Sequence, residues 1–183
     1  QEHRIGLTPD SVKALTEKNH EVLVENNGGF EAGFTNEDYL KAGAKIINTP
    51  EEIFKKAELI VKVKEPQMNE VKMIRDGQII YTYLHLAAAK ELTLGLMKSN
   101  SICIAYETVT DDNGRLPLLA PMSAVAGRMS IQAGAHCLEK NQKGRGLLIG
   151  GAPGVESANV VILGGGVVGE NAAIIATGMR GKV

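Results

Sequence analysis

The sequence predicts an α/β fold, in which a doubly wound, mostly parallel sheet is followed by the beginning of a second α/β unit. Three observations lead to this prediction. Helical and extended patterns alternate along the chain, with short turns between them. The runs 78–83 and 101–106 are rich in β-branched and aromatic residues, as strands buried on both faces are. A third apolar run, 159–163, leads directly into a glycine-rich turn.

Threonine-proline pairs mark where two of the predicted helices begin. Thr8 precedes Pro9 and Thr49 precedes Pro50, so a residue that caps helices is followed by proline at the first helical position. Apolar spacing and turn residues then define the elements of the first part of the chain. We predict helices over about 9–19, 36–42 and 50–57, and strands at 21–25, 44–47 and 58–63.

The middle of the chain continues this alternation up to a long helix. The stretch 89–99 has the apolar spacing of a helix, and 111–114 has the sequence of a tight turn. Residues 121–138 are rich in Ala, Gly and Ser, which predicts a long helix packed closely against its neighbours. A glycine-dense segment, 143–154, follows, and we interpret it as the seam between two domains.

Composition limits the classes of function. Of the 183 residues 44% are hydrophobic, and 20 basic side chains balance 21 acidic ones. This balance gives no basic surface that nucleic acid or a membrane would attract, so we expect neither partner. No apolar run reaches the roughly 18 residues that cross a bilayer, and the start has no signal-peptide pattern, so we expect a cytoplasmic location. Cys103 and Cys137 have neither metal-ligand nor disulfide spacing, and we expect both to be buried structural thiols and no metal to be bound.

The glycine-rich turn has the spacing GxGxxG between a predicted strand and a predicted helix. Gly164 permits the tight turn, Gly166 lets the backbone approach a pyrophosphate, and Gly169 allows the helix to pack on the strand. The helix that follows, beginning near Val167, offers amide donors to phosphate groups. We therefore predict a Rossmann dinucleotide-binding unit. The alternative is a turn that needs glycine only for its geometry.

This prediction divides the chain into two parts. We expect residues 1–124 to form an incomplete substrate domain, and residues 125–183 to hold a linking helix and the beginning of the dinucleotide-binding domain. The acidic residue that grips the adenosine ribose lies about 20 residues after such a turn, beyond Val183. NAD and NADP are therefore not separated by the sequence, and we expect the chain to be a fragment.

Three polar residues stand where ligands bind in open α/β sheets. Lys64 and His85 follow predicted strands, and the carboxyl ends of parallel strands line the ligand crevice. Arg4 precedes the first helix. Arginine suits bidentate recognition of a carboxylate, lysine can hold a carbonyl oxygen, and histidine suits proton transfer near neutral pH. Together they would fit an α-keto or α-amino acid.

Each of these residues also has a structural interpretation. Lys64 and Lys62 share strand parity, so either lysine could be a solvated charge at the end of a strand. His85 lies between two leucines and could be a core histidine, and Arg4 could be an ordinary surface residue. Ser123, at the start of the long predicted helix, could be its N-cap.

Several motifs in order resemble one enzyme family. They are Arg4-Ile5-Gly6-Leu7-Thr8-Pro9, Ile60-Val61-Lys62-Val63-Lys64-Glu65-Pro66, Tyr83-Leu84-His85-Leu86-Ala87, Ile104-Ala105-Tyr106-Glu107-Thr108-Val109, Leu116-Pro117-Leu118-Leu119-Ala120-Pro121-Met122-Ser123 and the glycine turn. Over essentially its whole length the chain resembles the alanine dehydrogenase/pyridine nucleotide transhydrogenase family, and its dehydrogenase branch more closely around His85.

The resemblance implies an activity and a role for each residue. It implies reversible oxidative deamination of L-alanine to pyruvate and ammonium in L-alanine catabolism, with NAD as hydride acceptor, by a homohexamer. Arg4 would bind the substrate carboxylate, Lys64 the keto oxygen, and His85 would be the catalytic acid/base. Ser123 and the 164–169 loop, with Gly164, Gly166, Val167 and Gly169, would bind the cofactor. The alternatives are a transhydrogenase-type nucleotide domain and a non-catalytic NAD-binding module.

Overall fold

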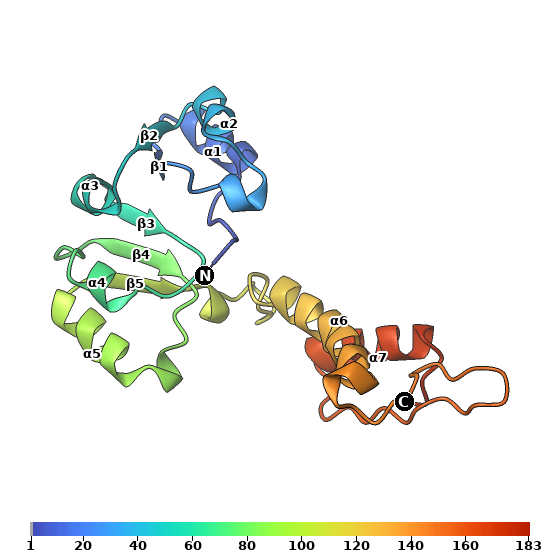
Figure 1. The fold of residues 1–183 in the computed structure, drawn as a ribbon. Coiled ribbons are helices and arrows are strands. Elements are labelled where there is room, and N and C mark those ends of the chain that lie inside the picture. The colour runs from blue at the N-terminus through green and yellow to red at the C-terminus, as the bar shows by residue number, and fades with distance from the viewer. Residues whose placement is uncertain (1) are drawn as a thin grey trace. The chain divides into compact units, whose positions relative to one another are not determined.

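The computed structural model describes residues 2–183. The chain divides into two compact units, Gln1–Val109 and Thr110–Val183. Both contain helices and extended segments, which are coloured along the chain in Figure 1. Within the described residues, no helix has the length and apolar character that crossing a membrane requires.

The first part of unit 1 is a small parallel sheet covered by helices. Strand β1 (Leu23–Glu25) pairs with β2 (Lys45–Ile47), and helices α1 (Pro9–Thr16) and α2 (Asn36–Lys41) pack with them (Figure 1). As the sequence predicts, the hydroxyl of Thr8 caps α1 by accepting the N–H of Ser11. Buried side chains join the helices to the strands: Val12, Val22, Tyr39, Ala42 and Ala44.

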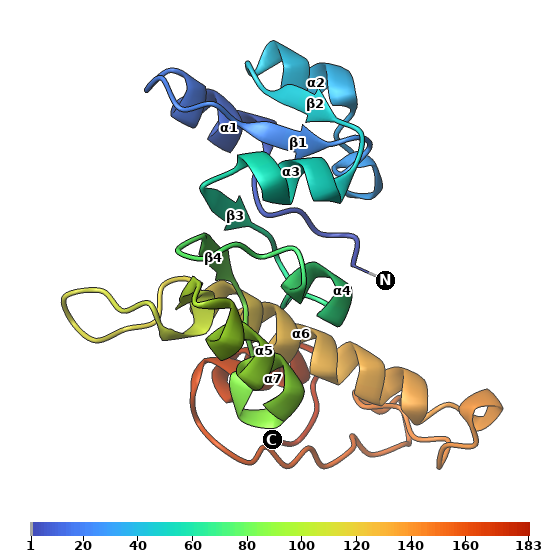
Figure 2. The same cartoon turned by 90° about the vertical axis from the view of Figure 1, so that its left-hand side faces the viewer.

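The second part of unit 1 is a three-stranded parallel sheet (Figure 1), and Figure 2 shows two of its strands, β3 and β4, from another side. Strand β4 lies between β3 and β5, and Thr82 pairs in register with Ala105. The elements are β3 (Leu59–Val61), β4 (Ile79–Thr82), β5 (Ile102–Ala105), α3 (Pro50–Lys56), α4 (Met68–Val71) and α5 (Lys90–Ser99). Their common core contains Phe54, Ile60, Val71, Ile74, Ile80, Leu84, Leu92 and Leu96.

The predicted elements of unit 1 are present, but the structure differs from the prediction in several details. The parallel strands form sheets of two and three strands instead of one continuous sheet. The strands are also shorter than the apolar runs that predict them, because only residues with a hydrogen-bonded neighbour belong to a strand. Helix α4 was not predicted, and short 3₁₀ turns join the elements: η1 (Phe30–Ala32), η2 (Leu86–Ala88), η3 (Tyr106–Thr108) and, in unit 2, η4 (Lys140–Gln142).

Unit 2 is built on two helices in close contact, α6 (Ala120–Cys137) and α7 (Val167–Gly178). A Cβ added to Gly127 would lie 2.2 Å from the carbonyl oxygen of Val168, so the two backbones touch where the side chain is missing. The core beneath them contains Ile131, Ile149, Ala172 and Ala176. Since Ile149 belongs to this core, the segment 143–154 lies inside unit 2 and is not the seam that we expected.

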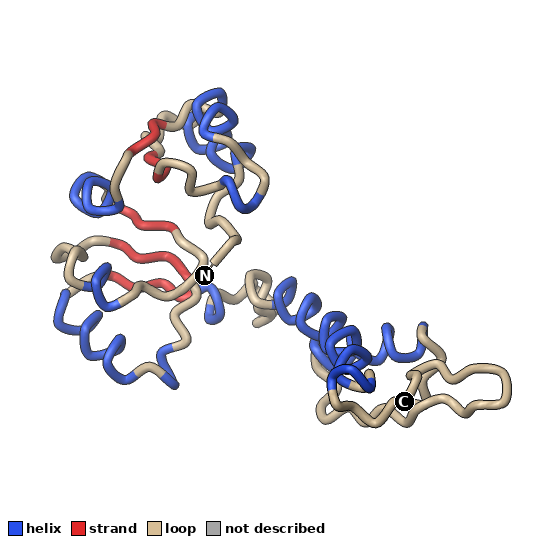
Figure 3. Tube along the Cα trace, in the orientation of Figure 1, coloured by secondary structure: helices blue, strands red, loops and turns tan. Residues whose placement is uncertain are grey.

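The apolar run 159–163 does not form a strand of its own. Among the described residues its ladder partner is Lys182, which pairs with Asn159 in an isolated parallel bridge. Figure 3 accordingly draws the run as loop. Val161 is 83% exposed and Leu163 is 95% exposed. A run with the composition of a doubly buried strand therefore stays extended without strand pairing over most of its length.

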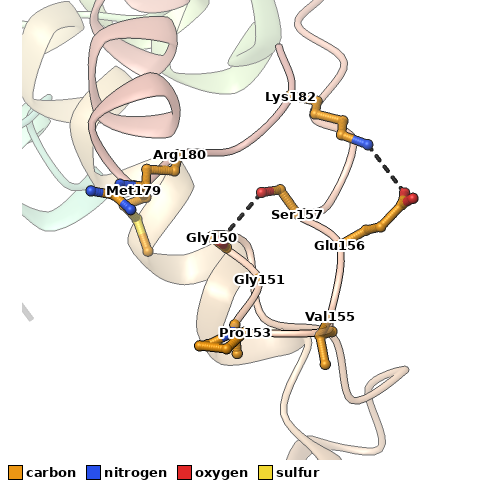
Figure 4. Close-up of a pocket in the computed structure, with 10 residues that line it drawn as sticks. Gly150, Gly151, Pro153, Val155, Glu156, Ser157, Met179, Arg180 and Lys182 are labelled. Atoms are coloured by element: carbon orange, nitrogen blue, oxygen red, sulfur yellow. Dashed lines mark hydrogen bonds and ion pairs between the residues drawn. The ribbon is translucent and has the colours of Figure 1, made fainter.

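A turn precedes this run and closes a shallow hollow (Figure 4). The hydroxyl of Ser157 donates to the carbonyl of Gly150 at 3.2 Å, and Lys182 pairs with Glu156 at 3.1 Å. These bonds hold the chain so that the next residues reach Lys182.

The prediction that both cysteines are buried is wrong for Cys137, which is exposed, whereas Cys103 is partly buried.

Cys137 is exposed because of its position on α6. Ile131, Ala135 and Leu138 follow one another at helical spacing, and these three side chains belong to the core of unit 2 or pack against it. Cys137 lies off this stripe.

Candidate functional site

Lys64 is held by its backbone at the end of the three-stranded sheet. The hydroxyl of Thr82, on β4 and fully buried, donates to the carbonyl oxygen of Lys64 at 2.8 Å. The N–H of Tyr83 donates to the carbonyl of Val63 at 3.2 Å. These bonds extend the pairing of β3 and β4 beyond the strands themselves. The backbone of Lys64 is therefore fixed by hydrogen bonds, while its side chain is exposed to solvent.

The structure distinguishes the two lysines that strand parity left equivalent. Lys62 Nζ lies 2.6 and 2.5 Å from the two carboxylate oxygens of Glu70, and both side chains are largely buried. Glu70 also accepts the N–H of Gln67 and so caps α4. Lys62 is thus part of a structural ion pair, while Lys64 is exposed.

Arg4 pairs with the carboxylate of Glu2, and the charge of Lys64 also acts on that carboxylate. Arg4 donates to Glu2 through Nε at 2.8 Å and through Nη2 at 2.7 Å, which is the bidentate geometry of arginine and carboxylate. The hydrogen bond from Arg4 lowers the pKa of Glu2 to about 2, and the charge of Lys64 acts in the same direction. All three residues line one hollow of unit 1. The two cations therefore form a place suited to a carboxylate.

His85 is exposed, so it is not a core histidine. Its ring stacks on Tyr83, with centroids 6.0 Å apart and an interplanar angle of 14°. Burial raises the pKa of Tyr83, and the nearby charge of Arg4 acts in the opposite direction. Tyr83 thus adjoins both Arg4 and His85. The lining of the hollow includes Arg4 and Lys64 but neither Tyr83 nor His85, so a site shared by all three predicted residues stays a prediction.

Three tyrosines from neighbouring strand ends support this part of the site. The ring of Tyr106 meets those of Tyr81 and Tyr83 edge to face, with centroids 4.3 and 4.9 Å apart. Desolvation raises the pKa of Tyr106 to about 12. A neutral aromatic cluster therefore backs the ring on which His85 stacks.

Sequence reasoning did not single out Glu107. Its Oε1 accepts the N–H of His85 at 2.7 Å and that of Leu84 at 3.0 Å. Burial acts to raise the pKa of Glu107, but these backbone N–H groups lower it, and the net pKa lies below its ordinary value of 4.5. A signal was present in the sequence, because Glu107 follows an apolar run just as His85 does.

The glycine loop of unit 2 has the features that a pyrophosphate site needs. Gly164 has φ +103°, which favours glycine, and a Cβ on Gly166 would meet nothing within 4 Å. Gly169 has no room, since its Cβ would lie 1.9 Å from the carbonyl oxygen of Gly164. Helix α7 begins at Val167, with Gly166 as its N-cap. The open space at Gly166 beside a helix N-terminus fits a dinucleotide phosphate.

Ser123 is not the N-cap of α6, because the helix begins at Ala120 after Leu119. The N–H of Ser123 already donates to the carbonyl of Leu119 at 3.1 Å, and the residue is partly buried. Ser123 lies one turn before Gly127, where α6 touches Val168 of α7. Its helix face therefore leads toward the first turn of α7.

Comparison with protein families identifies two domains in the chain. The N-terminal domain described as alanine dehydrogenase/PNT matches residues 1–126, and the corresponding C-terminal domain matches residues 130–183. The chain belongs to the alanine dehydrogenase/PNT family. The division of this family member at 124/125 stays a prediction, since the compact units meet at 109/110.

Individual relatives carry the name of the dehydrogenase. An alanine dehydrogenase of Halomonas elongata is 52% identical over 182 residues, and one of Mycobacterium tuberculosis is 48% identical. A solved L-alanine dehydrogenase matches the whole chain with a TM-score of 0.90 and 50% identity, covering 50% of its own chain. The chain spans about half the length of these curated relatives. A transhydrogenase from Sinorhizobium meliloti, at 22% identity and a TM-score of 0.79 over 98% of this chain and 53% of its own, shares the fold.

Proposed function

We propose that this chain carries the substrate-binding and nucleotide-binding parts of an NAD-dependent alanine dehydrogenase. The enzyme would convert L-alanine and water reversibly into pyruvate and ammonium as part of L-alanine catabolism. The observation that carries the proposal is the bidentate pairing of Arg4 with a carboxylate in the hollow that Lys64 also lines, together with the exposed His85 after strand β4. The names of the relatives at about 50% identity point to the same reaction.

The proposed roles follow from the chemistry of the three side chains. Arg4 would take the substrate carboxylate in the bidentate geometry that it now uses with Glu2. Lys64, as a point charge, would hold the keto oxygen or the carbinolamine oxygen. His85 would accept a proton from the water that attacks Cα and return it when the amine leaves, because imidazole titrates near neutral pH.

The cofactor is proposed to be NAD. When bound, its nicotinamide would accept the hydride from Cα of alanine. The residues proposed to bind it are Ser123, Gly164, Gly166, Val167 and Gly169. Support comes from the open space at Gly166 and the amide groups at the start of α7. The family resemblance favours NAD over NADP.

Assembly and location are part of the same proposal. A homohexamer is the assembly that the family resemblance implies. A cytoplasmic location fits the two cysteines, which are both free, because a reducing compartment keeps thiols unpaired.

The test is the activity of the full-length protein that contains this chain. We expect NADH oxidation that depends on both pyruvate and ammonium. His85→Ala should lower turnover by about 10²–10⁴-fold, the usual contribution of a positioned acid/base. Lys64→Ala should in addition raise KM for pyruvate, because a cation on the keto oxygen acts in the ground state as well. NADH affinity, measured by fluorescence titration, should stay near normal in both variants.

A matched control and the competing function complete the experiment. Lys62→Met removes a neighbouring lysine that is engaged with Glu70 and should alter stability more than the KM for pyruvate. Full activity in His85→Ala would remove that residue from the mechanism. Oxidation of NADH by a second nucleotide, without any keto acid, would favour the transhydrogenase alternative, whose fold is shared.

A further inference from the structure

His85 has a backbone conformation that needs an external support. It lies in the left-handed region, with φ +48° and ψ +38°, between strand β4 and the turn η2. Side chains with a Cβ rarely adopt this region, and asparagine is among those that do so most often. Among the described residues, the other non-glycine positions with positive φ are Asn19, Asn27, Asn100, Lys143 and Arg180. Histidine occurs in this region more often than most residues, but the conformation still costs free energy for a side chain with a Cβ, so a contact that holds His85 there stabilises it.

The support is the carboxylate of Glu107. Oε1 accepts the N–H of His85 at 2.7 Å, and the N–H of Leu84 is 3.0 Å from Oε1 and 3.2 Å from Oε2. Two successive backbone N–H groups therefore converge on one side chain. Such convergence fixes the direction of the peptide plane between Leu84 and His85, and with it the exit of the His85 side chain.

The register of the sheet explains why Glu107 reaches these groups. Strands β4 and β5 are parallel, and Thr82 lies opposite Ala105. Two residues further along each chain are Leu84 and Glu107, which are therefore neighbours beyond the ends of the strands. The turn η3, which contains Glu107, directs its side chain back toward β4.

We propose that Glu107 is a positioning residue, which holds His85 in the left-handed conformation and so aims the imidazole at the substrate. Glu107 holds the backbone of His85, and stacking on Tyr83 holds its imidazole ring. The oxygens of Glu107 are engaged by backbone N–H groups, so Glu107 orients the acid/base and does not itself exchange protons with substrate. This inference rests on the proposed role of His85.

The structural arm of the test uses hydrogen exchange by mass spectrometry on the full-length protein. In Glu107→Ala the amides of Leu84 and His85 lose their acceptor, and we expect them to exchange at least about tenfold faster. Glu107→Gln keeps the shape and one acceptor oxygen, so it should retain most of the protection and stay folded if the alanine variant does not. Thr108→Ala is the matched control, because it removes a hydrogen bond to Ala105 within the same turn and leaves Glu107 in place.

The kinetic arm measures kcat and KM for pyruvate in the same variants. A misplaced acid/base should cost about 100-fold in kcat, while KM changes little because Arg4 and Lys64 are untouched. Glu107→Gln should recover most of the activity, and Thr108→Ala should behave as the unmodified protein. Unchanged exchange of the Leu84 and His85 N–H groups in Glu107→Ala would overturn the proposal. So would faster exchange with normal kcat in a protein that His85→Ala inactivates.

The two arms separate this inference from the proposed function. If His85→Ala leaves activity intact while Glu107→Ala still frees the two amides, the proposed role of His85 fails. The support of its backbone by Glu107 then stands as a structural fact without the catalytic consequence, and the positioning role is overturned.

Discussion

Replacing Gly169 with alanine should destabilise the protein by an amount that the geometry of the loop defines. The new Cβ would lie 1.9 Å from the carbonyl oxygen of Gly164 and 3.3 Å from Cγ2 of Ile162. Because Cβ contacts essentially never fall below 3.0 Å, the loop must move by 1.1 Å or more. Overpacking costs about 1–3 kcal/mol, and a backbone obstacle places this case near the upper end. Alanine in a helix recovers up to about 1 kcal/mol, so we expect a net loss of about 2 kcal/mol.

The assay is equilibrium unfolding in urea, with Gly166→Ala as the matched control. A Cβ on Gly166 meets nothing within 4 Å, and its φ of −78° suits any residue. The control should therefore change the free energy of unfolding by less than about 1 kcal/mol, the usual range for an N-cap change. It should nevertheless weaken NADH binding, because its methyl group occupies the space proposed for the pyrophosphate. Equal stability of the two variants would refute the reasoning.

Three further predictions concern buried polar groups. Asn171→Leu removes the acceptor of Arg128 Nε, 2.9 Å away, and should lower the free energy of unfolding by about 2 kcal/mol in urea titrations. Thr82→Val removes the bond to the Lys64 carbonyl and should cost about 1 kcal/mol and raise KM for pyruvate, whereas Thr82→Ser should not. Tyr106 has its pKa raised from 10.0 to about 12, so its stabilising effect is complete below pH 10 and is lost as pH rises toward 12. The melting temperature should decrease as pH rises across this range, and the decrease should be smaller in Tyr106→Phe.

Elements with local signals were predictable from the sequence. Thr8 and Thr49 cap helices in the structure because a short hydroxyl side chain can accept a backbone N–H three residues later. The glycine turn was predictable for a similar reason, since Gly164 adopts a left-handed conformation and Gly169 has no room for a Cβ. In these cases the local backbone conformation itself requires that residue type, so the residue type predicts the conformation.

Features that depend on pairing between distant segments were not predictable. The run 159–163 has the composition of a strand, but composition does not say whether a neighbouring strand is present. The difference between Lys62 and Lys64 depends on Glu70, which lies on a helix that the sequence did not predict. Glu107 escaped notice because its role needs the register of β4 against β5.

The tyrosine cluster gives the chain a built-in optical reporter. The chain contains no tryptophan and four tyrosines. The rings of three of them, Tyr81, Tyr83 and Tyr106, are in contact, and Tyr83 stacks on His85. Near-ultraviolet circular dichroism depends on such asymmetric contacts between aromatic rings. An edge-to-face pair, the buried Tyr39 with Phe34, adds a second contribution, so Tyr39→Phe would leave a signal that reports on the packing of the three rings beside His85 without any added label.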